Sequence, residues 1–408
     1  MRAARVWEVH LESALAGLRV VEVGNFMAAP FCTMQLADLG ADVIKIENPD
    51  GGDQVRTTGP FIDGESSNFI RLNRNKRSLA LDLKAPKGKE VFRKLILSAD
   101  VLVENLRPGT MKDLELDWPR LSALNPRLVY VAASGWGQDG PYAQRPGLDI
   151  IAQGMSGLMS ITGVEGGAAP VKVGVPMTDL ACALYGALGT LAALRVREQT
   201  GKGQFVDVCL FEAGVSFAVW EAGKFFATGE VPKPLGSAHQ TSAPYQALKS
   251  SDGFFTIGAT SVPNWRALCK VLGLEALEND PRFAKNHLRH QNRGELIPLI
   301  EAVTSLQSSD HWVSALTEAG VPCGPLQKYD QVFNDPHLNE RKFFQDAPHK
   351  KLGAVRQIGS PMRLSETPTT MRRAGPMLGE HTTEVLKELN IPDEEIRALH
   401  QSGAVKTT

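Results

Sequence analysis

The stretch LRVVEVGNFMAAPFCTMQLADLGADVIKIENP, residues 18–49, constrains the fold of this chain more than any other segment. The valine-rich run LRVVEV predicts a strand, FCTMQLADLG a helix with Pro30 in its first turn and Gly40 at its end, and ADVIKIE a second strand. Two strands joined by a crossover helix lie parallel in one sheet. The sequence therefore predicts a doubly wound α/β fold.

The alternation of strand and helix patterns continues along the chain. SLALDLK, DVLVEN and RLVYVAASGWG are predicted strands, and PKGKEVFRKLILSA is a predicted helix. From about Pro232 the pattern changes to a strand meander followed by helices rich in leucine, glutamate and arginine. A chain of 408 residues exceeds what one core usually serves. We expect a large α/β domain at 14–200, a linker at 201–231, a smaller α+β domain at 232–318, and a second linker with the C-terminal segment at 319–408.

Charge and cysteine content narrow the partners and the compartment. With a formal net charge of -1 the chain has no acidic or basic excess, so neither nucleic acid nor an anionic membrane is an expected partner. The 5 cysteines form no C-x-x-C pair, which argues against disulfides and a zinc site and favours a reducing, cytoplasmic compartment without a bound metal. The longest weakly charged run, Leu180 to Leu194, is short for a bilayer and contains glycines, so we expect a buried helix of a soluble protein.

The first 17 residues leave their origin open. Charges interrupt MRAARVWEVHLESALAG before an apolar region forms, so a secretory signal is not expected. A native segment, a tag and a short targeting remnant all fit this pattern.

The loop after the first strand argues against a bound dinucleotide. GNFMAAP has one glycine, with Phe26 and Met27 where a G-x-G-x-x-G motif would let the backbone approach a pyrophosphate. Glu47 does end the second strand where a ribose-binding acid would lie. We therefore expect no permanently bound cofactor, although a loop at the carboxyl end of a parallel strand remains the expected place for a ligand.

Basic side chains gather around the loops of the first domain. A pocket for a small phosphorylated ligand and a solvated surface with some N-cap and carboxylate partners explain such a cluster about equally well. The residues are Arg71, Arg74, Lys76, Arg77, Lys84, Lys87, Arg107 and Lys112.

Asp179 is the only charged residue of GVPMTDLACALYGALGTLAAL, residues 174–194. Aspartate is a favoured helix N-cap and suits the positive end of the helix dipole, so local rules favour a capping role. The alternative is a carboxylate held in an enclosed site, because the small residues of the helix permit close packing and the preceding glycine-rich segment can supply backbone N–H groups.

Taken together, these segments resemble the class III CoA-transferase family. The resemblance covers nearly the whole chain, through the stretches already quoted and through NKRSLALDLKAPKGKE, DVLVENLRPGTM, GLDIIAQGMSGLMSITG, GVPCGP and LGEHTTEVLKELN. It implies a Rossmann-like large domain that the C-terminal segment completes, a second, smaller α+β domain, and an interlocked homodimer. The implied substrates are an acyl-CoA and a small carboxylic acid.

The resemblance implies that Asp179 is the catalytic residue. An ionised carboxylate can attack a thioester without a general base, and the implied intermediate is an aspartyl-CoA thioester. Asn48 and Ser134 stand where formyl-CoA transferase has an arginine and a lysine, with Lys112 a candidate for the missing charge. The implied CoA-binding residues are Met27, Ala28, Leu81, Lys84, Asn105, Leu106, Arg107, Lys112, Ser134, Gly135 and Gly137.

The same resemblance bears on the reaction and the substrate. A racemase of the family carries a histidine before the aspartate of a G-H-D motif, whereas this chain has Leu148 before Asp149, so acyl-CoA racemisation is the weaker alternative and Asp149 is expected to be structural. GSAHQTSAPYQ and NHLRHQNRGEL resemble the branch that uses dicarboxylates, which favours succinate or a glutarate, with His239 and Tyr245 on the substrate side. Formyl-CoA:oxalate transfer, a non-catalytic CoA-binding subunit, and a purely structural His239 remain open.

Overall fold

The computed structural model describes residues 12–407, so the first 11 residues, including most of the segment of open origin, lie outside the described residues. The chain divides into two compact units. Among the described residues, one unit holds 12–158, Val173–Gly223 and 336–407; the other holds Met159–Lys172 and Lys224–Asp335. The second unit thus takes residues 159–172, which the sequence places in the large domain.

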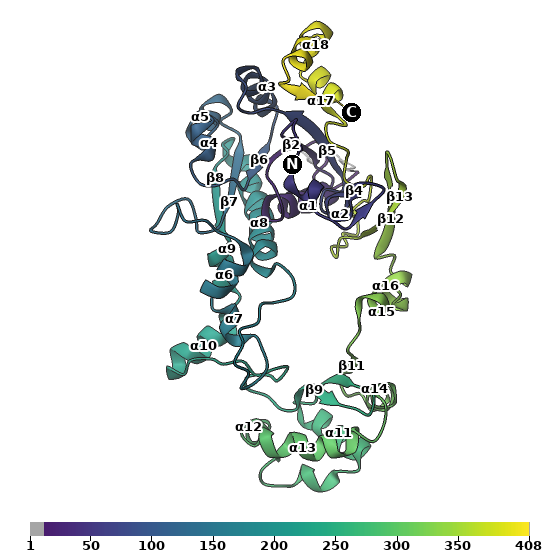
Figure 1. Ribbon diagram of the computed structural model, residues 1–408. Helices are drawn as coiled ribbons and strands as arrows, with labels where there is room; N and C mark the ends of the chain where they lie inside the picture. Colours follow the sequence, from purple (N-terminus) through teal and green to yellow (C-terminus); the bar gives the residue numbers. More distant parts are fainter. Residues whose placement is uncertain (1–11, 408) are drawn as a thin grey trace, which may run out of the picture. The chain divides into compact units, whose positions relative to one another are not determined.

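The first unit is built on a sheet in the order β14-β5-β2-β1-β6-β7-β8 (Figure 1). Every neighbouring pair from β5 to β8 is parallel, and only β14 pairs in the antiparallel direction. The predicted α/β class and the parallel pairing of the first two strands are confirmed. The strands are β1 Arg19–Val23, β2 Asp42–Glu47, β5 Lys76–Leu81, β6 Val101–Glu104, β7 Val129–Ser134, β8 Phe205–Cys209 and β14 Val405–Lys406.

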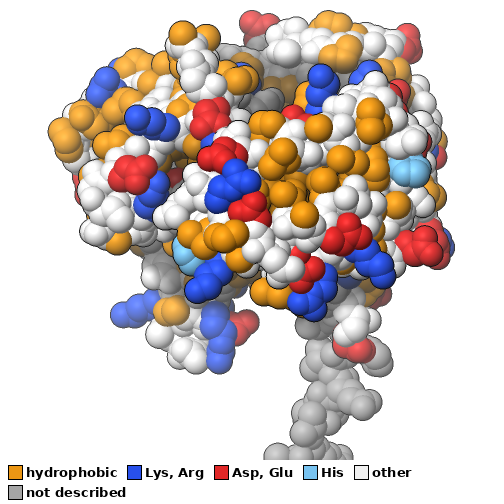
Figure 2. Space-filling model, turned by 90° about the horizontal axis from the view of Figure 1, so that it is seen from below, with side chains coloured by type: hydrophobic (Ala, Val, Ile, Leu, Met, Phe, Trp, Pro, Cys, Tyr) orange, Lys and Arg blue, Asp and Glu red, His pale blue; other side chains and the backbone are white. Residues whose placement is uncertain are grey.

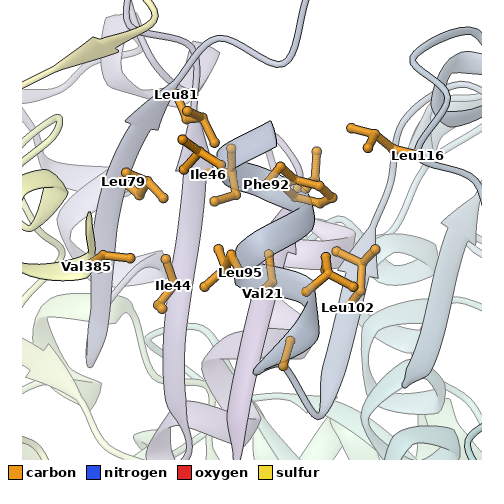
Figure 3. Packing of buried hydrophobic residues seen from close by; sticks show 14 of the residues in the cluster. Val21, Ile44, Ile46, Leu79, Leu81, Phe92, Leu95, Leu102, Leu116 and Val385 are labelled. Atoms are coloured by element: carbon orange, nitrogen blue, oxygen red, sulfur yellow. The ribbon is translucent and has the colours of Figure 1, made fainter. Parts of the chain in front are cut away.

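Helices cover both faces of this sheet. Alternate strand residues point to opposite faces, so Val21 and Ile44 join one core while Val20 and Val43 join the other. In Figure 3 Phe92 of α3 lies among the strand residues of the first core. That face is covered by α3 Pro86–Leu97, α5 Trp118–Leu124, α17 Thr382–Glu388 and α18 Asp393–Gln401, and the other by α1 Ala28–Asp38 and α8 Met177–Thr200.

The C-terminal segment returns to the first unit. Val385 of α17 is fully buried in the core beneath β5, and the Ala80 N–H of β5 donates to Thr382 Oγ1 at 3.1 Å. β14 then adds to the edge of the sheet by pairing with β5. Residues 201–231, expected as a linker, instead contain β8, because Val206 and Val208 pack on the core and the strand pairs with β7.

Shorter elements complete the first unit. They are η1 Gln54–Thr57, β3 Phe61–Ile62, β4 Glu65–Ser66, α2 Ser67–Leu72, α4 Thr110–Asp113, α6 Asp149–Met155, α9 Leu210–Ser216, α16 Pro336–Glu340, β12 Phe344–His349 and β13 Gly353–Ile358. α7 Leu158–Ile161 and α10 Val219–Thr228 each contain a point where the chain passes from one unit to the other.

The second unit is a small antiparallel sheet with helices. β9 Tyr245–Lys249 and β10 Phe254–Gly258 form the predicted meander, with β11 Cys323–Pro325 on the other side of β10. Phe255 and Trp265 lie in its core. Its helices are α11 Val262–Leu272, η2 Glu275–Glu278, α12 Asn286–Gln291, α13 Arg293–Thr304, α14 Ser309–Glu318 and α15 Tyr329–Val332.

The long helix α8 has two sides of different character. By length and composition alone it could cross a membrane, a test that core helices of globular proteins also pass. Ala183 and Ala187 pack in the sheet core, whereas Leu184 and Leu188 are exposed. The expectation of a buried helix therefore holds for one side only. Figure 2 shows basic and acidic side chains interspersed on one face of the molecule, in keeping with the balanced charge.

Candidate active site

The candidate site lies at the carboxyl ends of β1 and β6, where the strand order changes direction. The helices after β1 and β6 leave toward opposite sides of the sheet, which opens a crevice between the two following loops. These loops are joined by Asn25 and Asn105, because the Asn25 N–H donates to Asn105 Oδ1 at 3.0 Å and Asn105 Nδ2 donates to the Asn25 carbonyl at 2.8 Å. A Cβ on Gly24 would lie 2.7 Å from Asn105 Oδ1. The single glycine of this loop thus allows two loops to approach.

A cavity of about 1170 Å³ opens in this crevice, entirely within the first unit. Its wall includes the loops after β1, β6 and β7, residues of α2, and the first turn of α8. Gly135 and Gly147 bring two of its walling loops together, because a Cβ on Gly135 would lie 2.9 Å from the Gly147 Cα. The position and size of the cavity make it the expected ligand site.

A buried charge network fixes the loop after β1. Lys45 Nζ lies 2.5 Å from Glu22 Oε1 and 2.8 Å from Asp53 Oδ2, and it donates to the Gly24 carbonyl. Asp53 Oδ1 accepts from the N–H of Phe26, whose φ of 58° is the left-handed conformation that most side chains avoid. Burial alone would raise the pKa of Glu22, but Lys45 and Lys76 lower it to about 2. The buried ion pairs and their hydrogen bonds therefore stabilise the strained conformation of the loop after β1.

Asp179 stands at the cavity wall in the first turn of α8. The helix begins at Met177 with Pro176 before it, so Asp179 is the third helical residue, and the predicted N-cap role is wrong. Asp149 of α6 supplies the cap instead: its Oδ1 accepts from the Thr178 N–H at 3.0 Å and from Thr178 Oγ1 at 2.7 Å. Because Asp149 caps the helix, the Asp179 carboxylate has no capping role and can face a ligand in the cavity.

Electrostatics set Asp179 apart from an ordinary aspartate. Within residues 12–407 its carboxylate accepts no hydrogen bond. Burial first, and the negative charge of Asp149 second, raise its pKa from 3.8 to about 7. About half of the molecules then carry the ionised form at pH 7. The attack that the resemblance implies needs the ionised carboxylate, and full ionisation of Asp179 needs a pH above 7.

Many of the residues predicted to bind CoA meet at this cavity, and some do not. Leu81, the last residue of β5, is buried in the core, Lys112 is exposed on α4, and Gly137 donates its N–H to Ser134 Oγ at 2.9 Å. With Lys84, these do not line the cavity, and their role in CoA binding stays a prediction. The predicted residues in the wall are Met27, Ala28, Asn105, Leu106, Arg107, Ser134, Gly135 and Asp179.

His239 and Tyr245 lie together in the second unit. Their rings meet edge to face with centroids 4.9 Å apart, and the backbone N–H of His239 donates to the backbone carbonyl of Tyr245 at 3.0 Å. The structure thus brings the two predicted substrate residues together, and their contact with a substrate stays a prediction.

Most of the basic cluster before β5 is engaged in ion pairs. Arg74 pairs with Asp38 at 2.5 Å, and Lys76 with Glu22 at 2.7 Å. Arg77 contacts three acidic side chains. Glu47 is likewise buried against Arg56 and is unavailable to a ribose. The carboxylate partners that the surface alternative included are present, but the three basic side chains are buried rather than solvated, and only Arg74 among them also lines the cavity.

Among the described residues, three arginines of the cavity wall were absent from the predicted site: Arg71, Arg74 and Arg145. Arg71 of α2 was visible only as one of several basic residues, and Arg145 carried no sequence signal. Arg145 stacks over Tyr142, 4.6 Å from its ring centroid, at the exposed rim. Within residues 12–407 no group of three or more His, Cys, Asp or Glu side chains is arranged to hold a metal ion.

Comparisons with known proteins show which chains this one is similar to. A family model described as "CoA-transferase family III" matches residues 15–382. A mouse protein named succinyl-CoA:glutarate CoA-transferase is 37% identical over 394 residues, which cover 96% of this chain and 90% of that protein. Acetyl-CoA:oxalate CoA-transferase of Acetobacter aceti is 37% identical over 379 residues, which cover 92% of this chain and 96% of that protein.

A solved structure shows the same fold. The crystal structure of a CAIB/BAIF family protein from Brucella suis matches with a TM-score of 0.83 and 37% sequence identity. The match covers 92% of this chain and 99% of that one.

Proposed function

This chain belongs to CoA-transferase family III and is a CoA-transferase, and we propose that it moves CoA from succinyl-CoA or a similar dicarboxylyl-CoA to a carboxylic acid through an aspartyl-CoA thioester on Asp179. One observation carries the proposal. The Asp179 carboxylate stands at the wall of the crevice cavity, without a hydrogen bond from residues 12–407, while Asp149 caps its helix.

The reaction divides into two symmetrical halves. In the first, an Asp179 carboxylate oxygen attacks the thioester carbonyl of the donor, the C–S bond breaks, and a mixed anhydride forms with release of CoA thiolate. The thiolate attacks the Asp179 carbonyl, the donor acid leaves, and Asp179 carries CoA as a thioester. In the second half the acceptor carboxylate attacks this thioester and releases the thiolate. The thiolate then takes the acceptor acyl group and restores the Asp179 carboxylate.

The environment of Asp179 fits this role. Only the ionised carboxylate is nucleophilic, and no residue has to remove a proton from it above its pKa of about 7. Partial burial keeps water away from the anhydride and thioester, which would otherwise hydrolyse. Leu148, beside Asp149 in the cavity wall, has no ionisable group. Racemisation by proton transfer between Asp179 and a side chain at position 148 is therefore the weaker alternative.

The names of the relatives support a dicarboxylate substrate. They couple succinyl-CoA with glutarate, D-citramalate or mesaconate. The acetyl-CoA:oxalate relative makes oxalate a second candidate acceptor. An acceptor screen with succinyl-CoA, in which the CoA esters are read by mass, separates these acids.

Trapping of the intermediate tests the mechanism. Wild-type protein incubated with succinyl-CoA and hydroxylamine should carry a hydroxamate on the peptide that contains Asp179. The Asp179→Asn variant should bind CoA with unchanged affinity but show no transfer to any acid. Transfer at the wild-type rate by this variant, or trapping on a different peptide, would contradict the assignment.

We further propose that the first unit is Rossmann-like and that the chain forms an interlocked homodimer. The parallel strands β5-β2-β1-β6-β7-β8 have the order of a dinucleotide-binding sheet, which supports the first part. The second part is supported by large apolar side chains exposed on one side of α8, among them Leu184 and Leu188 at 50% and 62% exposure. The free state of all five cysteines supports a cytoplasmic location.

A further inference from the structure

Four arginines line the cavity, and three of them have an evident environment. Arg74 is buried and paired with Asp38 through contacts of 2.5 to 3.2 Å. Arg107 and Arg145 are exposed at the rim, where water solvates their charge. Arg107 also donates to the Gln144 carbonyl at 3.0 Å. These three need no further partner to explain their position.

Arg71 differs from the other three. It is partly buried on α2, and its Nη1 donates to the carbonyl and to the Oγ of Ser67, one turn earlier, at 2.9 and 2.6 Å. Among residues 12–407 it forms no ion pair, and its Nε and Nη2 have no hydrogen-bond acceptor. Burial lowers its pKa, because the charged form has lost water without gaining a carboxylate. The hydrogen bonds to Ser67 therefore hold Nη1 in place and leave the N–H groups of the other two nitrogens, Nε and Nη2, available.

The surroundings of Arg71 favour an anionic ligand. Arg71 is half-buried, and Val55 and Leu72 belong to the same cavity wall, so water reaches its charge less freely than it reaches the exposed arginines of the rim. A planar guanidinium with two free N–H directions matches the two oxygens of a carboxylate. Phosphate groups of CoA are a second source of anions, but Arg107 already lies on the loop after β6, a different element from α2. The separate placement of the two arginines favours two separate anions.

We propose that Arg71 binds the distal carboxylate of the dicarboxylic acid while the other carboxyl group reacts at Asp179. The inference rests on the proposed function and adds the residue that distinguishes dicarboxylates from monocarboxylates. A site with a buried polar partner rejects an analogue that lacks the matching group, because the partner is then left unpaired.

Succinate and butanoate test this assignment, because the second replaces one carboxylate of the first by a methyl group. With glutaryl-CoA as donor, so that transfer to succinate yields a new CoA ester, we expect kcat/KM of Arg71→Gln for succinate as acceptor to fall about 10- to 100-fold relative to that for butanoate. Arg71→Lys keeps the charge without the planar guanidinium, so its preference for succinate over butanoate should lie between those of the wild type and Arg71→Gln. The matched control is Arg120→Gln on α5, which removes an exposed arginine outside the cavity.

Two further measurements separate the possible failures. The affinity for free CoA should be the same in wild-type and Arg71→Gln protein. An equal loss for both acids together with weaker CoA binding would make Arg71 a phosphate ligand and overturn the inference, as would unchanged kinetics. If wild-type protein transfers CoA to no acid, the proposed function fails. Calorimetry of succinate binding then still tests whether Arg71 binds a carboxylate. Equal affinities of wild-type and Arg71→Gln protein for succinate would refute that role.

Discussion

Replacement of Asp149 by asparagine should shift the pH dependence of transfer. The pKa of Asp179 is raised from 3.8 to about 7, with burial the larger cause and the charge of Asp149 the second. A like charge in a partly buried site contributes about 1 pKa unit. Because burial remains, we expect the pKa of Asp179 in Asp149→Asn to fall to about 6 rather than to its ordinary value.

The rate follows from the ionised fraction of Asp179. At pH 6 a group of pKa 7 is about 9% ionised and a group of pKa 6 about 50%, so kcat/KM should rise about fivefold. At pH 8 Asp179 is more than about 90% ionised in both the wild type and Asp149→Asn, so their values of kcat/KM should differ little. The assay is kcat/KM for transfer from succinyl-CoA to glutarate between pH 5.5 and pH 8.5, since kcat/KM reports ionisations of the free enzyme.

The substitution has a structural cost that the assay must separate. In the wild type, Gln153 Nε2 donates to the Asp149 carboxylate at 2.7 Å. Asparagine keeps an oxygen for the two hydrogen bonds from Thr178 but presents an amide group to Gln153 Nε2, which has no acceptor there. The loss of that bond should lower the free energy of unfolding by about 1 kcal/mol. Asp207→Asn removes a similar charge outside the cavity and serves as the control. An acidic limb that stays in place in a folded Asp149→Asn protein, or that moves equally in the control, would refute the reasoning.

Three further predictions concern stability and assembly. Lys45→Met should lower the free energy of unfolding by about 3–5 kcal/mol, because it leaves Glu22 and Asp53 buried without their shared cation. The control Lys89→Met removes an ion pair with the exposed Glu115 and should lower it by at most about 1 kcal/mol. Urea unfolding measures both changes. The pKa of Glu22 is lowered from 4.5 to about 2, so its contribution to stability is fully present above pH 4.5 and should be lost as the pH falls toward 2, seen as a falling urea midpoint that Lys45→Met makes shallower. Leu188→Glu should convert a dimer to a monomer in light scattering, whereas Leu97→Glu, at 57% exposure on α3, should leave the mass unchanged.

The polar residues of the site show why part of it could not be read from sequence. Asp179 and its helix were visible because a lone carboxylate beside an apolar run is a local pattern. The cap was misassigned because the true capping group, Asp149, lies 29 residues away from Thr178 in the chain. Arg71 and Arg74 look alike in sequence, yet only Arg74 has a carboxylate partner, which comes from a residue 36 positions earlier.

By itself, the sequence determined the alternation of strands and helices from β1 to β7 and the parallel pairing of β1 with β2, because these follow from local periodicity and connection length. Tertiary structure alone decided the rest. It paired Arg77 with Glu388, joined Asn25 to Asn105, returned the C-terminal segment to β5, and placed Asp149 near Asp179. Each of these depends on distances between residues far apart in the chain, and such distances set the charge state of Asp179 and the N–H groups that Arg71 keeps free.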